Sequence, residues 1–75
     1  MECPVCGADA KQIPSGVGRI GIVCRVCGEY DAETAVIATG QWRTLESEQR
    51  RDVLDKAKRS AQAGIRPLIQ PYLLD

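Results

Sequence analysis

Several features are missing from this 75-residue sequence, and each absence narrows what the chain can be. It has no histidine, no phenylalanine and no apolar run near the roughly 20 residues that cross a bilayer. Ten basic residues balance ten acidic ones, so the formal net charge is zero. We therefore expect neither a membrane protein nor a protein that binds nucleic acid through a large positive charge.

The length and the first residues indicate a small cytoplasmic domain. A chain of 75 residues buries only a modest fraction of its surface, so it is expected to need a staple such as a metal. Glu2 and Cys3 follow Met1 directly, which leaves no room for a cleavable secretory signal, and we expect a cytoplasmic protein. Thiols stay reduced in that compartment, so we interpret the four cysteines as metal ligands in preference to disulfide-bonded pairs.

The cysteines form two pairs with the spacing of a metal site. Two residues separate Cys3 from Cys6 and Cys24 from Cys27, and seventeen residues separate the pairs. Two intervening residues let both sulfurs of one turn reach a single ion about 2.3 Å away. The sequence therefore predicts one structural Zn²⁺ bound by all four cysteines.

The complete set of thiolate ligands predicts a structural metal and no catalysis. Gly7 and Gly28 each follow the second cysteine of a pair, where a residue without a Cβ can turn backbone amides toward the sulfurs. With four thiolates and no histidine, no position on the metal remains for water or substrate. The sequence also has no nucleophile signature and no glycine-rich phosphate loop, so we expect no enzyme.

Two segments, Cys3-Pro4-Val5-Cys6-Gly7 and Cys24-Arg25-Val26-Cys27-Gly28, resemble the paired knuckles of zinc ribbon proteins. The resemblance covers about the first 32 residues. The continuation through Glu29 and Tyr30 is similar to small bacterial and phage zinc ribbon proteins that carry a helical extension. This resemblance implies a zinc ribbon fold. Zinc ribbons as a group include nucleic-acid-binding and protein-docking modules, so it leaves the function open.

The alternative metal is iron, which rubredoxins hold in a similar site of four thiolates. The lack of phenylalanine leaves only Tyr30, Trp42 and Tyr72 to surround a redox centre, and the stretch between the cysteine pairs is shorter. Zinc is therefore favoured. We assign Tyr30 and Trp42 to packing in the core, with stacking on nucleic-acid bases as the alternative.

The pattern predicts a small α+β, metal-stabilised fold in one folding unit. Residues 1–33 are expected to form the ribbon, with strands at residues 10–14, 19–24 and 30–32 and a turn at residues 15–18. Residues 34–75 are expected to form a helical extension packed on the ribbon. Within it, residues 34–40 favour a short helix, and a strand stays open.

A long C-terminal helix is predicted for residues 45–63. Thr44 or Ser47 can cap its start, and Gly64 stands at the expected C′ position. Its apolar stripe and its ion pairs follow helical spacing. The stripe consists of Val53, Leu54, Ala57, Ala61 and Ile65, and the pairs are Glu46 with Arg50, Asp52 with Lys56, and Asp55 with Arg59.

The tail, residues 66–75, is unusually apolar for a chain end. Pro71 argues against an uninterrupted helix, so we expect an extended segment that lies on the ribbon or on a partner. In the second case the partner-docking residues are Leu68, Ile69, Tyr72, Leu73 and Leu74.

The predicted function is a protein-interaction or regulatory module, whose partner is another protein or a second copy of the chain. We expect no membrane and no small-molecule substrate. The alternative is a nucleic-acid-binding zinc ribbon. The resemblance favours this alternative, because zinc ribbons include nucleic-acid-binding modules, but the neutral net charge of the chain does not. Its contacts would be Lys11, Arg19, Arg25, Arg50, Arg51 and Arg59.

Overall fold

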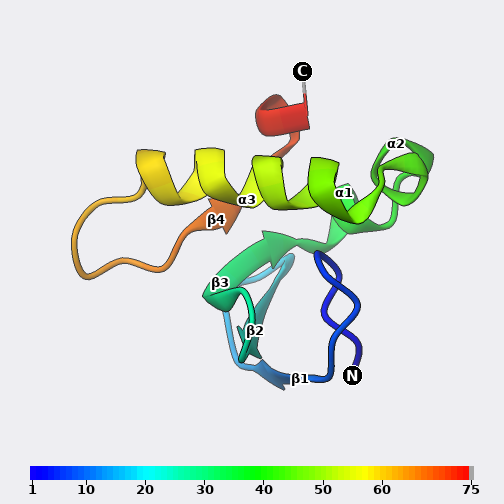
Figure 1. Cartoon of the computed structure of the whole chain (residues 1–75). Helices are drawn as coiled ribbons and strands as arrows, with labels where there is room; N and C mark the ends of the chain where they lie inside the picture. The colour runs from blue at the N-terminus through cyan, green and yellow to red at the C-terminus, as the bar shows by residue number, and fades with distance from the viewer. Residues whose placement is uncertain (75) are drawn as a thin grey trace.

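Four strands in one sheet and three helices make up the computed structural model, which describes residues 1–74 (Figure 1). The expected small α+β fold is confirmed. The sheet order is β1-β2-β3-β4, antiparallel except for the parallel pair β3 and β4. The elements are β1 (Ala10–Ile13), β2 (Arg19–Cys24), β3 (Gly28–Glu33), α1 (Thr34–Ile37), α2 (Gly40–Thr44), α3 (Ser47–Ser60), β4 (Leu68–Ile69) and the 3₁₀ turn η1 (Pro71–Leu74).

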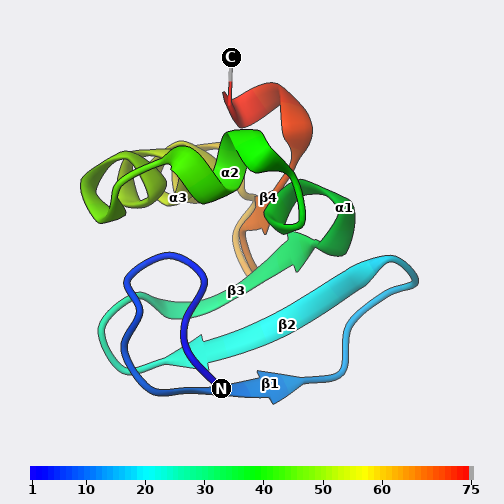
Figure 2. The same cartoon turned by 90° about the vertical axis from the view of Figure 1, so that its right-hand side faces the viewer.

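The two N-terminal hairpins follow the expected pattern. β1 and β2 pair over the predicted residues, and β2 continues through the second cysteine pair into β3, which is longer than predicted. The short helix α1 follows directly, as favoured for residues 34–40. Figure 2 shows the three antiparallel strands side by side, with the helices on one side of them.

The core lies between one face of the sheet and α3. Ile22, Tyr30 and Ala32 alternate on that face and are fully buried. They join the buried residues of the helices and tail in one cluster, which includes Val36, Trp42, Val53, Leu54, Ala57, Ile69 and Leu73. Burying one large apolar side chain contributes about 1.5 to 3 kcal/mol, so this cluster is a main source of stability outside the cysteines.

The prediction of one long C-terminal helix is wrong. The chain bends out of helical conformation at Leu45 and Glu46, which separates α2 from α3. Of the helices in residues 1–74, only α3 is longer than seven residues, and it is followed by β4 and η1. It is neither long nor apolar enough to cross a membrane, which holds for every helix that the structure describes.

The break has a local cause that composition alone does not reveal. The side chain of Glu46 accepts from the amide of Gln49, and the Gln49 side chain accepts from the Glu46 amide at 2.8 Å. This capping box starts α3 at Ser47, in place of a cap by Thr44 or Ser47. The Thr39 side chain caps α2 by accepting from the Trp42 amide.

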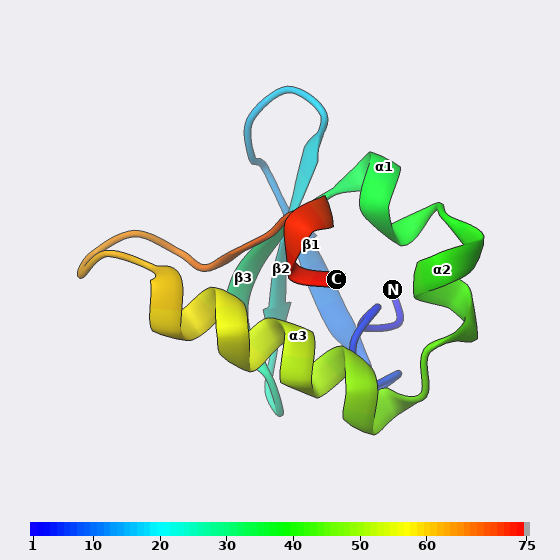
Figure 3. The same cartoon turned by 90° about the horizontal axis from the view of Figure 1, so that it is seen from above.

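The end of α3 also differs from the prediction. Ala61 already has extended backbone angles, and Gly64, with φ of +83°, lies in the loop beyond the helix. Ala61 is half-buried and Ile65 is 62% exposed, so neither continues the buried stripe. The helix therefore ends before the reversal that places the tail beside β3. Figure 3 shows this loop extending past the helix end and returning.

The returning tail forms the fourth strand of the sheet. Leu68 and Ile69 pair with Asp31 and Ala32, and the Asp31 amide donates to the Pro67 carbonyl at 2.7 Å. Ile69 and Leu73 are buried in the core, as expected for a tail that packs on its own chain, and in this structure they are not available for the alternative of docking to a partner. Leu68 and Leu74 are half-buried, which leaves Tyr72 as the most exposed of the predicted docking residues.

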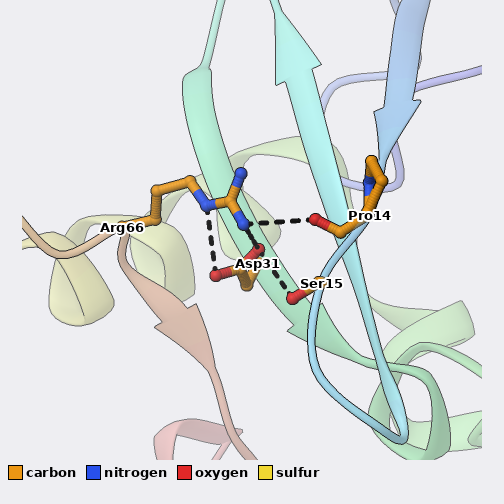
Figure 4. Close-up of polar contacts among 4 residues, drawn as sticks. All are labelled: Pro14, Ser15, Asp31 and Arg66. Atoms are coloured by element: carbon orange, nitrogen blue, oxygen red, sulfur yellow. Dashed lines mark hydrogen bonds and ion pairs between the residues drawn. The ribbon is translucent and has the colours of Figure 1, made fainter.

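A polar network on the other face of the sheet holds the tail in place (Figure 4). The Arg66 guanidinium contacts both carboxylate oxygens of Asp31, at 3.1 and 3.3 Å, and donates to the Pro14 carbonyl at 3.4 Å. The Ser15 hydroxyl donates to Asp31 Oδ1 at 3.0 Å. One carboxylate on β3 thus ties the turn after β1 to the tail.

Candidate metal centre

The first cysteine pair lies in a tight turn, as the spacing of its residues predicts. The Gly7 amide donates to the Cys3 carbonyl at 2.8 Å, and the Cys3 amide donates to the Ala8 carbonyl at 2.7 Å. Gly7 has φ of +78° and Gly28 has φ of +86°, a region that side chains disfavour. Each glycine therefore closes a knuckle: residues 3–7 form the first and residues 24–28 the second.

The four cysteine sulfurs meet in one cluster. All four Sγ atoms lie within 4.8 Å of one another, and none of the cysteines forms a disulfide. Cys3 and Cys27 Sγ are 3.9 Å apart, and Cys6 and Cys24 Sγ are 3.5 Å apart. Sulfurs about 2.3 Å from a tetrahedral zinc would be about 3.8 Å apart, so the donor set fits one such ion.

Solvent reaches the four sulfurs unequally. Cys3, Cys24 and Cys27 are buried, whereas Cys6 is half-buried and lies at the edge of the core. A metal held here would be shielded by protein around three of its ligands. Cys6 is then the ligand most open to an electrophile or to a competing chelator.

Burial and backbone hydrogen bonds act in opposite directions on the pKa of the Cys24 thiol. Burial is the largest influence on the pKa of Cys24 and raises it, but hydrogen bonds from the Cys27 and Val26 backbone and from neighbouring thiols lower that pKa to about 7. The Cys27 amide lies 3.4 Å from Cys24 Sγ. Burial raises the pKa of Cys27 well above its usual value, and Cys6 raises it further. A divalent cation would replace the proton that Cys27 otherwise retains.

Tyr30 contributes a hydroxyl to the cluster. Its oxygen lies 3.0 Å from Cys3 Sγ, and the side chain is fully buried. Burial is the main cause that raises the pKa of this phenol, so the hydroxyl keeps its proton. The sequence pattern predicted packing in the core for Tyr30, with stacking on nucleic-acid bases as the alternative, and did not predict this contact. The signal that could have found its second role is strand alternation, which places Tyr30 on the same face of the sheet as Cys24.

Two basic side chains of α3 bind the knuckles through backbone carbonyls. Arg50 Nη1 donates to the Pro4 carbonyl at 3.3 Å, and Lys58 Nζ donates to the Cys27 carbonyl at 3.0 Å. One contact reaches each knuckle, so α3 spans the cysteine cluster. No sequence signal predicts these contacts, because they depend on how the helix lies over the ribbon.

Arg50, one of the predicted nucleic-acid contacts, is half-buried and is bound to backbone carbonyls of its own chain. Its guanidinium also donates to the Trp42 and Arg43 carbonyls, at 3.3 and 3.2 Å, and lies 5.5 Å from the centre of the Trp42 ring. The predicted ion pair with Glu46 does not form, nor do the other two pairs predicted along α3. Within residues 1–74 the ion pair between side chains is that of Arg66 with Asp31.

Most of the other predicted nucleic-acid contacts lie along different grooves of the surface. Lys11 and Arg25 line a shallow groove of about 300 Å³ along β1 and β2, together with Asp9. Arg51 lines a smaller groove between α3 and the second knuckle, and Arg59 lines a third one beside Tyr72. Arg19 is exposed at the start of β2. Lys11 and Arg25 therefore share one groove, whereas Arg51 and Arg59 line two others.

Comparison of the chain with protein-family models, with curated proteins and with solved structures finds no match. The geometry of the cysteine cluster and of the surfaces around it is thus the basis for a functional conclusion.

Proposed function

We propose that this chain is a zinc ribbon protein of the cytoplasm, in which one structural Zn²⁺ supports a module that binds another protein. The observation that carries the metal assignment is the cluster of four cysteine sulfurs within 4.8 Å of one another. Four thiolates suit zinc and leave no coordination position for a substrate, so the ion stabilises the fold and performs no chemistry.

The interaction surface that we propose lies around Tyr72, beside the C-terminal end of α3. Tyr72 is 58% exposed and borders two adjoining grooves. One groove, of about 320 Å³, carries Lys56 and Arg59, and the other is flanked by Ile65, which is 62% exposed. Apolar side chains beside two cations fit a protein segment that combines an apolar residue with an acidic one.

The acidic residue could come from a second copy of this chain, so self-association is the form of the proposal to test first. Native mass spectrometry at two protein concentrations would report metal content and assembly together. We expect one zinc per chain and a dimer that grows with concentration. Tyr72→Ser should weaken the dimer, because it removes the aromatic ring between the two grooves.

The matched control is Val17→Ser, which removes an apolar side chain that is fully exposed at the turn between β1 and β2. It should leave the dimer unchanged. A monomer at every concentration would exclude self-association and leave a different protein as the partner. Equal effects of both substitutions would count against a surface at Tyr72.

The nucleic-acid alternative has one observation in its favour, the convergence of Lys11 and Arg25 in the groove on β1 and β2. Asp9 in the same groove and the neutral chain oppose it. Fluorescence titration with single-stranded and duplex DNA at several salt concentrations tests this function. Binding that falls steeply with salt, and that weakens in Lys11→Ala and Arg25→Ala, would favour the alternative.

A further inference from the structure

The hydroxyl of Tyr30 is directed at one particular sulfur. It lies 3.0 Å from Cys3 Sγ, and within residues 1–74 it has no other hydrogen-bond partner. The tyrosine is 0% exposed and Cys3 is 2% exposed, so water has no access to either group. A buried hydroxyl without a partner is costly, and this contact is what satisfies it.

We propose that Tyr30 is a positioning residue for the metal centre, because its hydroxyl donates a hydrogen bond to the Cys3 thiolate in the metal-bound state. The inference rests on the proposed zinc site and adds a determinant of its affinity. A metal-bound thiolate has no proton to donate, so the phenol must be the donor. A hydrogen bond to an ionised acceptor is stronger than one between neutral groups.

The two knuckles differ in how their first cysteine is supported. In the second knuckle the Cys27 amide approaches Cys24 Sγ at 3.4 Å, so the turn supplies its own donor. Cys3 receives no such amide among the described residues, and the donor comes from β3, 27 residues along the chain. Tyr30, on β3, therefore supplies the hydrogen-bond donor to Cys3 that the backbone of the first knuckle does not supply.

The sheet fixes the direction of this donor. Tyr30 pairs with Ile22 in the middle of β3, and two residues away Cys24 pairs with Gly28. Since alternate residues share a face, the ring and the Cys24 sulfur point to the same side of the sheet. The ring is held by the core and by its strand, so the hydroxyl reaches Cys3 without loss of side-chain freedom on metal binding.

The test compares Tyr30→Phe with the wild-type chain and with Tyr72→Phe. Tyr30→Phe keeps the buried ring and removes only the donor, whereas Tyr72→Phe makes the same chemical change at an exposed position. Zinc affinity is measured by competition with a chromophoric chelator. We expect Tyr30→Phe to bind zinc about 10- to 100-fold more weakly and Tyr72→Phe to bind like wild type.

Cobalt substitution supplies a second readout that a general loss of stability would not move. Without the hydrogen bond the Cys3 sulfur is more electron-rich, so the thiolate-to-cobalt charge-transfer band of Tyr30→Phe should shift to longer wavelength. The band of Tyr72→Phe should not move. Zinc affinity within twofold of wild type, with an unchanged cobalt spectrum, would overturn the inference.

A measurement on the wild-type chain covers the case in which Tyr30→Phe does not fold. In the cadmium-substituted protein, the Tyr30 hydroxyl proton should exchange slowly and show scalar coupling to cadmium through the hydrogen bond. A rapidly exchanging hydroxyl proton would overturn the proposal. Failure of the wild-type chain itself to bind zinc, cobalt or cadmium would instead overturn the metal site, and this inference with it.

Discussion

The ribbon, residues 1–33, and the extension, residues 34–74, are organised over very different distances along the chain. In the ribbon, knuckles close within five residues and strands pair across short turns. In the extension the decisive contacts join distant positions, such as Arg50 to the Pro4 carbonyl and Arg66 to the Pro14 carbonyl. The spacing of residues in the sequence predicts local contacts, whereas contacts between distant residues depend on strand register and on how the helices pack on the sheet.

The two halves also differ in what each contributes to the site and to the core. The ribbon contains the cysteine cluster, and the extension supplies much of the apolar cover through Trp42, Leu54 and Ile69. Its α3 also binds a carbonyl of each knuckle. We therefore expect a disturbance of the metal site to spread into the extension, and a disturbance of the tail to stay more local.

Removal of the metal should have the largest effect. Apparent zinc-binding free energies of small zinc domains are on the order of 10 to 16 kcal/mol at neutral pH, which is more than this core could replace. A strong chelator should therefore unfold the ribbon and release α3 from the knuckles. Circular dichroism and amide NMR spectra measure both. Spectra that stay unchanged after complete metal removal would contradict the dependence of the two halves on the ion.

Gly21→Ala should be the most costly change on the outer face of the ribbon. A Cβ at this position would lie 2.7 Å from Ile13 Cγ1, 3.0 Å from the Ile13 carbonyl and 3.2 Å from Asp31 Oδ1. We expect a loss of about 1 to 3 kcal/mol in the free energy of unfolding. Chemical denaturation of the zinc-bound protein measures it.

The matched control for that substitution is Gly40→Ala. No atom lies within 4 Å of a Cβ there, and the residue begins α2, where alanine is the better helix former. Its stability should be unchanged or slightly higher. Equal losses for both variants would mean that Gly21 is not needed for the close approach of Ile13 and Asp31.

Arg50→Ala should weaken the attachment of the extension to the first knuckle. Arg50 donates to three backbone carbonyls and stacks near Trp42, so its loss should cost roughly 1 to 2 kcal/mol. Arg59, which is exposed and has no hydrogen bond within residues 1–74, should cost less than about 0.5 kcal/mol as Arg59→Ala. Thermal and chemical denaturation compare the two. Similar values would remove the special role of Arg50.

Arg66→Gln should have the smallest global effect and a clear local one. The pair with Asp31 is partly solvent-exposed, so we expect a loss near 1 kcal/mol or less. Hydrogen exchange should locate the change at the Asp31 amide, which donates to Pro67 in the tail. Faster exchange there, with unchanged protection in β2, is the expected pattern. Uniform acceleration over the whole chain would show that tail and ribbon unfold together.

The sequence by itself determined the parts of this protein whose geometry is local. Two residues between cysteines, a glycine after each pair and β-branched residues around a glycine-containing turn were sufficient to predict the cysteine cluster and the first hairpin, and the short helix favoured for residues 34–40 forms at residues 34–37. In each case neighbouring residues alone set the backbone angles and bring the groups together.

Only the tertiary structure decided the rest. Residues 45–63 all have acceptable helix propensity, and the start of α3 at Ser47 has a local cause in the capping box of Glu46 with Gln49, but its end at Ser60 precedes a chain reversal that places the tail beside β3. β4 has two residues, too few for a sequence pattern, and it pairs with β3 where Ile69 is buried in the core and Arg66 contacts Asp31. The contact of Tyr30 with Cys3 likewise requires a strand register. Such contacts depend on the positions of distant residues, which local propensities do not encode.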